Sequence, residues 1–196
     1  MLILRIDPKT PDAAALKKAA AVLKSGGLVV YPTETAYALG CDPKSPKAVK
    51  RLFSVKQRDA AKRLPMIAAS TAMAMRHLKL DRYGRILAKA FWPGPLTLVA
   101  PVAMRVSPHP WASALSKALG RPVISTSANR SGRATVYDIP SVLKDLGAMP
   151  DLVLDAGRLK PSPVSTIVRP SGGAMEILRE GAVSEEALQR AMMKSL

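Results

Sequence analysis

Apolar and polar residues are arranged along this chain in short blocks, and most blocks are bounded by proline, glycine or a hydroxyl residue. Short apolar runs of this kind predict buried strands. The predicted strands cover residues 2–6, 27–32, 64–69, 96–101, 122–126, 151–155, 165–169 and 174–179.

The segments between these runs carry helix-start signals. Thr10-Pro11 predicts a helix that reaches Lys24 and stops at Gly26-Gly27, because a capping hydroxyl followed by proline favours the first helical turn. Further helices are expected from Ser45-Pro46 to about 57, after Ser70, after Asp81, over 111–119, from 138–140 and from Ser184. Strands and helices alternate early and strands cluster late, which predicts an α/β fold with a twisted, mixed parallel and antiparallel sheet flanked by helices.

The length of 196 residues suits one domain spanning 1–196, since no linker, repeat or low-complexity segment divides the chain. Apolar residues make up 48% and aromatic residues only 4%, so an aliphatic core is expected. Arg5 and Asp7 interrupt the early apolar run, and no uncharged stretch has bilayer length. We therefore expect a cytoplasmic protein without a membrane partner.

Cysteine and histidine are too few for common metal or disulfide frameworks. Cys41 is the single cysteine, and His77 and His109 lie 32 residues apart. This pattern excludes a cysteine-rich zinc site and lacks the spacing of a histidine metal site, so no metal-binding side chains are identified.

Positive charge is concentrated in the middle of the chain. The net charge is +16, and the segment 44–137 contains 18 Lys or Arg but only two acidic residues. Such a field attracts polyanions such as RNA, or small phosphorylated ligands. Solubility alone is the alternative explanation.

Phosphate-binding glycine motifs of the GxxxxGK[ST] and GxGxxG types are absent, so four loops are the candidates for chemistry. The first, YPTETAYALGCD (31–42), follows a buried strand and carries hydroxyls and a carboxylate. The second, VKQRDAAKR (55–63), lies near a helix end, where cations also complement the helix dipole. Lys56 and Arg58 would face one polyphosphate only if the chain becomes extended there.

The third loop, VISTSANRSGR (123–133), contains the chain's only asparagine, Asn129. Hydroxyls, an amide and loop N–H groups suit an adenylate, although an ordinary Asn/Ser turn explains the pattern equally well. The fourth candidate pairs SPVSTIV (162–168) with ILREG (177–181). No nucleophile triad is visible, so the composition favours charge neutralisation, as phosphoryl or nucleotidyl transfer requires.

Taken in order, these segments resemble the Sua5/YciO/YrdC family, the threonylcarbamoyl-AMP synthases, in its short bacterial form. The resemblance runs from about Gly26 to Gly181, through GGLVVYPTETAYALG, VKQR, FWPGPLTLV, VAMRVSPHP, STSANRSG, STIV and ILREG. It implies a concave, positively charged cavity. It also implies that L-threonine, bicarbonate and ATP, with Mg²⁺, give L-threonylcarbamoyl-AMP and diphosphate for the t6A modification at tRNA position 37. The implied partners are tRNA and t6A-transfer proteins of the TsaB, TsaD and TsaE type.

The resemblance assigns roles to individual residues of this sequence. It implies catalytic roles for Lys56, Arg58, Ser127 and Asn129. It implies threonine contacts by Thr35, Arg105, Ser125 and Ser165. It implies ATP contacts by Arg58, Ser127, Thr135 and Arg179.

The sequence departs from the family pattern at three places. Ala69 stands about where some members have a histidine, Ser107 stands where proline is usual, and the segment before VAMRV is short. The alternatives are a YciO-like or RNA-binding member without this activity and a relative that handles another carbamoyl adenylate. No general base is identified.

Overall fold

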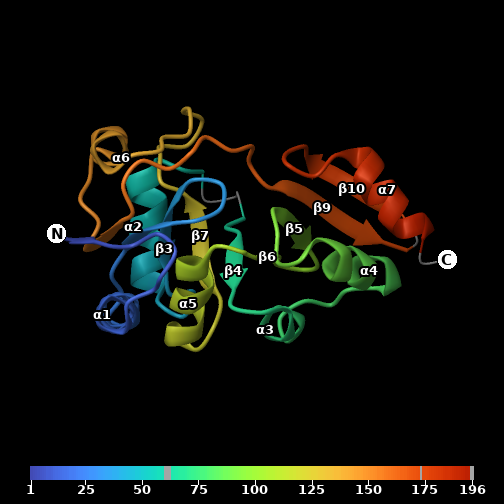
Figure 1. The fold of residues 1–196 in the computed structure, drawn as a ribbon, viewed down its shortest axis with the longest axis horizontal. Coiled ribbons are helices and arrows are strands. Elements are labelled where there is room, and N and C mark those ends of the chain that lie inside the picture. Colours follow the sequence, from blue (N-terminus) through green and yellow to red (C-terminus); the bar gives the residue numbers. More distant parts are fainter. Residues whose placement is uncertain (60–62, 173, 195–196) are drawn as a thin grey trace.

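The computed structural model describes residues 1–59, 63–172 and 174–194, and its strands form one ten-stranded sheet (Figure 1). The strands are β1 (Leu2–Arg5), β2 (Val29–Pro32), β3 (Tyr37–Cys41), β4 (Met66–Ala68), β5 (Leu96–Val99), β6 (Ala103–Val106), β7 (Val123–Ser127), β8 (Leu152–Asp155), β9 (Thr166–Ser171) and β10 (Ala174–Arg179). The helices are α1 (Ala13–Lys24), α2 (Pro46–Lys56), α3 (Thr71–Met75), α4 (Arg82–Phe91), α5 (Pro110–Leu119), α6 (Ile139–Leu146) and α7 (Glu185–Met193).

The sheet is mixed, as the sequence predicts. Its strand order is β1-β8-β2-β3-β7-β4-β6-β5-β9-β10. The pairs β1–β8, β2–β8, β4–β6 and β5–β9 are parallel, and the other neighbours are antiparallel. Strands that are distant in the sequence therefore lie side by side, which allows separate loops to meet in one site.

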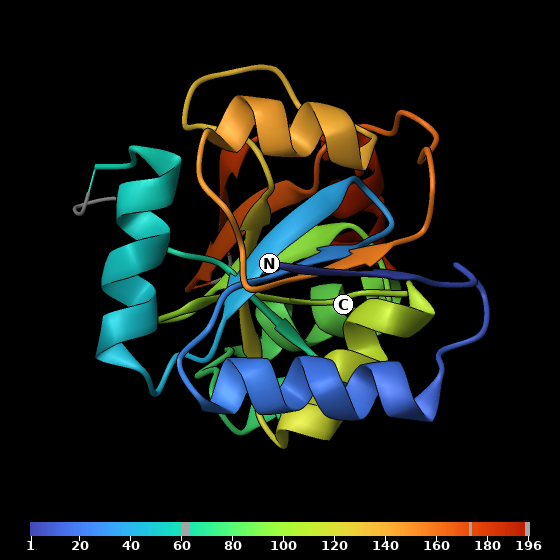
Figure 2. The same ribbon diagram turned by 90° about the vertical axis from the view of Figure 1, so that its left-hand side faces the viewer.

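Helices cover both faces of the part of the sheet that contains β2, β3 and β8. Figure 2 shows α1 and α5 on one side of these strands and α6 on the other. Trp111 and Leu115 of α5 pack with α1 against one face, and Leu52 of α2 packs with Val142 of α6 against the opposite face. Helices α4 and α7 pack together at the other end of the sheet, over β5 and β9.

Most helix starts follow the predicted capping residues. The side chains of Ser45, Ser70, Asp81, Asp138 and Ser184 each accept a hydrogen bond from a backbone N–H in the first turn of the helix that follows. These contacts satisfy donors that have no partner within the helix.

The predicted start of the first helix at Thr10-Pro11 is wrong by two residues. Asp12 is the N-cap instead, because its carboxylate accepts the N–H of Ala15 at 2.7 Å. A carboxylate caps a helix at least as well as a hydroxyl and also favours the positive end of its dipole.

Two strands, β3 and β6, were not predicted as strands. β3 lies inside the segment read as a polar loop, yet all five of its residues are buried between β2 and β7. β6 directly follows the turn at Ala100-Pro101 and pairs with β5 and β4. Across the described ranges, no helix is long and apolar enough to cross a membrane.

Candidate active site

A cavity of about 290 Å³ lies where β5, β6, β7, β9 and β10 meet the loop between β2 and β3. The alternation of side chains along β5 explains how a buried strand contributes to it. Leu96 and Leu98 enter the core beneath α4, and Thr97 and Val99 line the cavity. In β6 the same alternation places Arg105 in the cavity wall.

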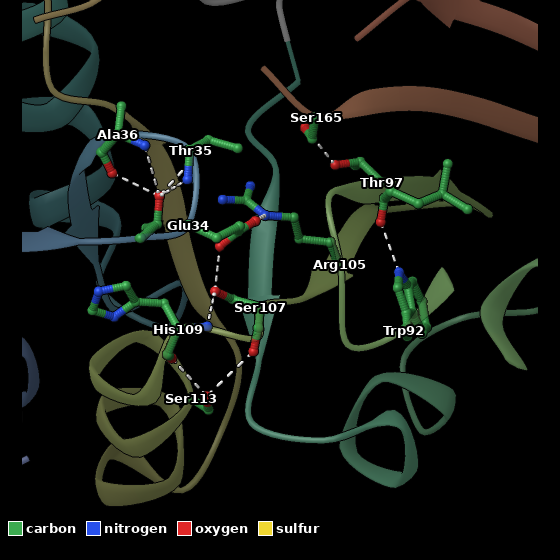
Figure 3. Close-up of polar contacts among 12 residues, drawn as sticks. Glu34, Thr35, Ala36, Trp92, Thr97, Arg105, Ser107, His109, Ser113 and Ser165 are labelled. Atoms are coloured by element: carbon green, nitrogen blue, oxygen red, sulfur yellow. Dashed lines mark hydrogen bonds and ion pairs between the residues drawn. The ribbon is translucent and has the colours of Figure 1, made fainter. Parts of the chain in front are cut away.

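The loop between β2 and β3 is folded around the Thr33 hydroxyl. This hydroxyl donates to the carbonyl of Ala36 at 2.6 Å and accepts the backbone N–H groups of Thr35 and Ala36 at 3.3 and 3.2 Å (Figure 3). It also lies 3.1 Å from the Thr35 hydroxyl. These bonds hold a tight turn whose residues line the cavity.

Arginine is the only ionisable residue type other than tyrosine among the described residues that line the cavity. The arginines are Arg58, Arg63, Arg105, Arg169 and Arg179. Burial lowers the pKa of Arg179, and the nearby charges of Arg105 and Arg58 lower the pKa further. An anionic ligand would relieve this repulsion between guanidinium groups.

Arg179 and Ser165 connect the two late segments that the sequence singled out. Arg179 donates from Nη2 to the Ser165 carbonyl at 2.6 Å and to the Ser165 hydroxyl at 3.0 Å. The Ser165 hydroxyl also lies 3.0 Å from the hydroxyl of Thr97 (Figure 3). The cavity wall therefore has a continuous row of polar groups from β5 to β10.

A few buried polar atoms make no hydrogen bond, and some of them belong to side chains that line this cavity. In the described part of the chain, they are Tyr31 Oη, Arg58 Nε, Ser125 Oγ and Asn129 Oδ1. Arg58 and Ser125 line the cavity itself. Leaving a buried polar group unpaired costs about 1–3 kcal/mol, so a ligand that pairs with Arg58 in the cavity wall would be favoured.

The end of α2 directs Lys56 and Arg58 to different places. The cap residue between them, Gln57, has a left-handed backbone with φ of 48°, so the chain turns there. Lys56 is only 1% exposed, and its Nζ donates to the carbonyls of Ser127 and Asn129, both at 2.5 Å. Burial, together with the nearby charge of Arg58, lowers the pKa of Lys56 to about 8.

Asn129 holds the loop that follows β7. Its Nδ2 donates to the carbonyl of Arg133 at 2.6 Å and to the carbonyl of Ala134 at 3.2 Å. The backbone N–H of Ser131 donates to the carbonyl of Lys56 at 2.9 Å. These contacts fasten the loop to the end of α2 and fix the segment between Ser127 and Thr135, both of which line the cavity.

Comparison with known proteins identifies the family. The Sua5/YciO/YrdC family model, described as "Telomere recombination", matches residues 21–181. The chain belongs to this family.

Similar family members include proteins named threonylcarbamoyl-AMP synthase. One from Alkalilimnicola ehrlichii is 37% identical over 190 residues, covering 89% of this chain and 97% of the relative. One from Vibrio cholerae is 34% identical over 189 residues, covering 85% of this chain and 97% of the relative.

Solved structures of family members have the same fold. P. abyssi Sua5 complexed with L-threonine superimposes with a TM-score of 0.89 at 29% identity, over 97% of this chain. This chain spans 61% of the length of that protein. E. coli YciO superimposes with a TM-score of 0.82 at 25% identity, covering 93% of this chain and 97% of YciO.

Most residues to which the family resemblance assigns a role meet in one place. The residues that line the cavity are Thr35, Arg58, Arg105, Ser125, Ser127, Thr135, Ser165 and Arg179. Lys56 and Asn129 do not line it, and they hold the loop behind Ser127 instead. Lys56 and Arg58 were expected to face one polyphosphate only if the chain became extended between them, and the structure has a left-handed turn at Gln57 instead.

Several residues of the site had no assigned role in the sequence interpretation. Arg63, Thr97 and Arg169 line the cavity, and Glu34 binds Arg105 from behind it. The alternation Leu96-Thr97-Leu98 is a signal that could have found Thr97. No group of three or more His, Cys, Asp or Glu suited to hold a metal occurs within 1–59, 63–172 and 174–194.

Proposed function

We propose that this protein is an L-threonylcarbamoyladenylate synthase. It would convert L-threonine, bicarbonate and ATP into threonylcarbamoyl-AMP and diphosphate, and would thus be a nucleotidyltransferase. The relatives named threonylcarbamoyl-AMP synthase support this proposal, and one of them is matched over 97% of its length. The complex of P. abyssi Sua5 with L-threonine supports an amino acid as a substrate.

The observation that carries the proposal is the lining of the cavity of about 290 Å³. Guanidinium groups from Arg58, Arg105 and Arg179 converge there with hydroxyls of Thr35 and Ser165. Separate cationic groups suit a ligand pair with separate anionic parts, namely a carboxylate and a polyphosphate. Hydroxyl groups both donate and accept, so they suit the amine, hydroxyl and carbonyl groups of such ligands.

The first step would form a carbamate. Loss of hydroxide from bicarbonate gives CO₂. The neutral amine nitrogen of threonine then attacks the carbon of CO₂, an N–C bond forms as one C=O bond becomes C–O⁻, and the proton lost from the nitrogen joins the hydroxide to give water. Arg105 would hold the threonine carboxylate, and the Thr97–Ser165 hydroxyl pair would orient the rest of the amino acid. Holding the amino acid in this way lowers the entropic part of the barrier.

The second step would join the carbamate to the nucleotide. A carbamate oxygen attacks the α-phosphorus of ATP, an O–P bond forms, and the bond to the β-phosphate oxygen breaks to release diphosphate. Negative charge grows on phosphate oxygens, and Arg58 and Arg179 would stabilise it through charged hydrogen bonds. The Nε–H of Arg58 is buried and makes no hydrogen bond, so a small movement of this side chain would let it donate to a phosphate oxygen.

Mg²⁺ enters this proposal with ATP. The cavity wall in the described ranges presents arginines and hydroxyls but no carboxylate. A Mg²⁺ ion would therefore be held chiefly by phosphate oxygens and water, as is common for this ion. It would supply further charge neutralisation at the phosphates.

The product would serve the t6A modification of tRNA. Threonylcarbamoyl-AMP is an activated acyl donor, so further proteins of the TsaB, TsaD and TsaE type would transfer its threonylcarbamoyl group to adenosine 37. In this proposal, tRNA is the final acceptor of the threonylcarbamoyl group.

A diphosphate-release assay tests the function. Purified protein, ATP, Mg²⁺ and bicarbonate should release diphosphate only when L-threonine is present, and mass spectrometry should detect threonylcarbamoyl-AMP. An inactive protein that still binds tRNA would support a family member that only binds RNA. Diphosphate release driven by carbamoyl phosphate would support a relative that handles another carbamoyl adenylate.

A further inference from the structure

A chain of hydrogen bonds runs from the N-terminus of α5 to the guanidinium of Arg105. Arg105 Nε donates to Glu34 Oε1 at 2.8 Å, and the Ser107 hydroxyl donates to Glu34 Oε2. The Ser107 hydroxyl in turn accepts the backbone N–H of His109, the N-cap of α5, at 3.1 Å. Figure 3 shows Glu34 between Arg105 and Ser107, with its two carboxylate oxygens turned toward different partners.

The whole chain of hydrogen bonds is removed from solvent. The side chains of Arg105 and Glu34 are only 8% and 13% exposed, and Ser107 is buried. A carboxylate with both oxygens engaged has little freedom to rotate, and its charge strengthens both hydrogen bonds. The Glu34 carboxylate therefore fixes the Nε edge of the guanidinium.

The other edge of the guanidinium is open to a ligand. Arg105 lines the cavity, whereas Glu34 does not. In the described structure, the Nη1 and Nη2 atoms of Arg105 make no hydrogen bond, so four N–H donors stay available after Nε is bound. Two of these donors in one plane match the two oxygens of a carboxylate.

We propose that Glu34, supported by Ser107, is a positioning residue that turns the free edge of Arg105 into the cavity and so selects an amino acid with a free α-carboxylate. This inference rests on the proposed function, because it takes one occupant of the cavity to be an amino acid. Glu34 acts only through Arg105. Its two oxygens already accept hydrogen bonds, so it is not placed to take a proton from the substrate amine.

Paired titrations with L-threonine and L-threoninamide test the selection of the carboxylate. In Glu34→Gln, the dissociation constant for threonine should rise about tenfold, which corresponds to about 1.4 kcal/mol. The dissociation constant for threoninamide should stay the same, because this analogue has no carboxylate. ATP affinity should change less than twofold, and Glu185→Gln on the exposed first turn of α7 is the matched control.

Two further variants separate positioning from a structural role. Ser107→Ala removes the donor to Glu34 and should raise the dissociation constant for threonine by about threefold. Ser107→Thr keeps the hydroxyl, so its dissociation constant for threonine should be close to that of the wild type. Equal losses for threonine, threoninamide and ATP would overturn the proposal, and so would an unchanged preference for threonine over threoninamide. A large fall in turnover at saturating threonine, with affinity intact, would make Glu34 a base and would also overturn it.

A measurement without substrate distinguishes this proposal from the proposed function. The ¹⁵N–¹H signal of Arg105 Nε, assigned with Arg105→Lys, should be slow to exchange in the wild type and fast in Glu34→Gln. If the wild type binds no threonine and forms no product, the proposed function fails, and this signal alone decides the positioning. An Arg105 signal that does not respond to Glu34→Gln would refute the positioning role.

Discussion

Individual side chains in this site have separate tasks, although some of them are neighbours in the sequence. Arg58 lines the cavity, while Lys56 is buried and bonded to two backbone carbonyls. Gln57 separates them because its left-handed backbone conformation ends α2 and changes the direction of the chain. We therefore expect substitutions at these neighbouring positions to have different signatures, one in catalysis and one in stability.

Arg58→Ala should lower turnover at saturating ATP and threonine by about a hundredfold or more. The reason is that loss of one donor to a developing anion typically costs 10²–10³ in rate. Diphosphate release measures this effect, and the thermal midpoint checks that the fold survives. Arg76→Ala, which removes the same charge from an exposed helix end, should leave turnover unchanged. Full activity of Arg58→Ala would remove this residue from the site.

Lys56 should make the stability of the protein rise with pH between about 8 and 10. Its pKa is lowered to about 8 in the folded protein, so in this range the unfolded chain holds more protons than the native protein. The stabilisation is fully present above the unfolded pKa and is lost as the pH falls through the folded pKa. Relative to Lys56→Met, the wild type should gain about 2 kcal/mol between pH 7.5 and 9.5, given an unfolded pKa of about 10.4.

Urea denaturation of both proteins at the two pH values measures this difference. The comparison cancels contributions from tyrosines and from other lysines. If the stability difference does not change with pH, Lys56 keeps its ordinary pKa in the folded protein.

At the level of elements, the sequence predicts features that depend on neighbouring residues, but not features that depend on residues far apart in the chain. The caps Ser45 and Asp81 were predicted because a capping side chain acts on the first turn of its own helix. β3 is not predicted as a strand because the residues just before it are rich in hydroxyl groups, as in a loop. Only its pairing with both β2 and β7 identifies it as a strand. The sequence also does not predict where the Lys56 side chain points, because the carbonyl groups that it binds lie 71 and 73 residues away.

The family motifs predicted most of the residues that line the cavity, but not the network behind them. Glu34 lies in a polar loop, yet nothing near it in the sequence indicates contact with Arg105 or Ser107. Pairing of β6 with β4 and β5 places Arg105 in the sheet, and this pairing joins segments that are far apart in the chain. Motifs identify residue types at fixed spacing, whereas such networks depend on sheet order.

Gly181, just after β10, illustrates how closely two elements approach beside the site. A Cβ atom at this position would lie 2.2 Å from the Val164 carbonyl oxygen and 2.7 Å from the Thr166 backbone nitrogen. Gly181→Ala should therefore separate the chain after β10 from the segment before β9 and disturb the bonds from Arg179 to Ser165. We expect a loss of about 2–3 kcal/mol in the free energy of unfolding.

The measurement for Gly181→Ala is chemical denaturation combined with an ATP titration. Both stability and ATP affinity should fall, because the same shift moves Arg179. Wild-type stability in this variant would mean that the two segments can separate without cost.

At the scale of the whole molecule, the net charge of +16 exceeds the charge of the residues that line the cavity. Five arginines line the cavity, and many other Lys and Arg residues lie outside it. Such an excess attracts nucleic acids through their phosphates and releases counterions on binding.

If tRNA binds this protein directly, its affinity should fall at least about tenfold between 50 and 200 mM salt. Filter binding or fluorescence anisotropy at several salt concentrations measures the slope. A weak dependence of the affinity on salt would show that tRNA does not bind through the Lys and Arg residues of the surface.

The order of the sheet has a further consequence for how a ligand affects the protein. Within the sheet, β3 and β7 are separated from β9 and β10 by β4, β6 and β5, yet residues of both pairs of strands line the same small cavity. A molecule held there bridges β3 and β7 with β9 and β10, so any partial opening that spreads these strands apart must first expel it. Occupancy should therefore protect the backbone amides of β3, β7, β9 and β10 together, and substrate supply would set the lifetime of the folded protein as well as its output.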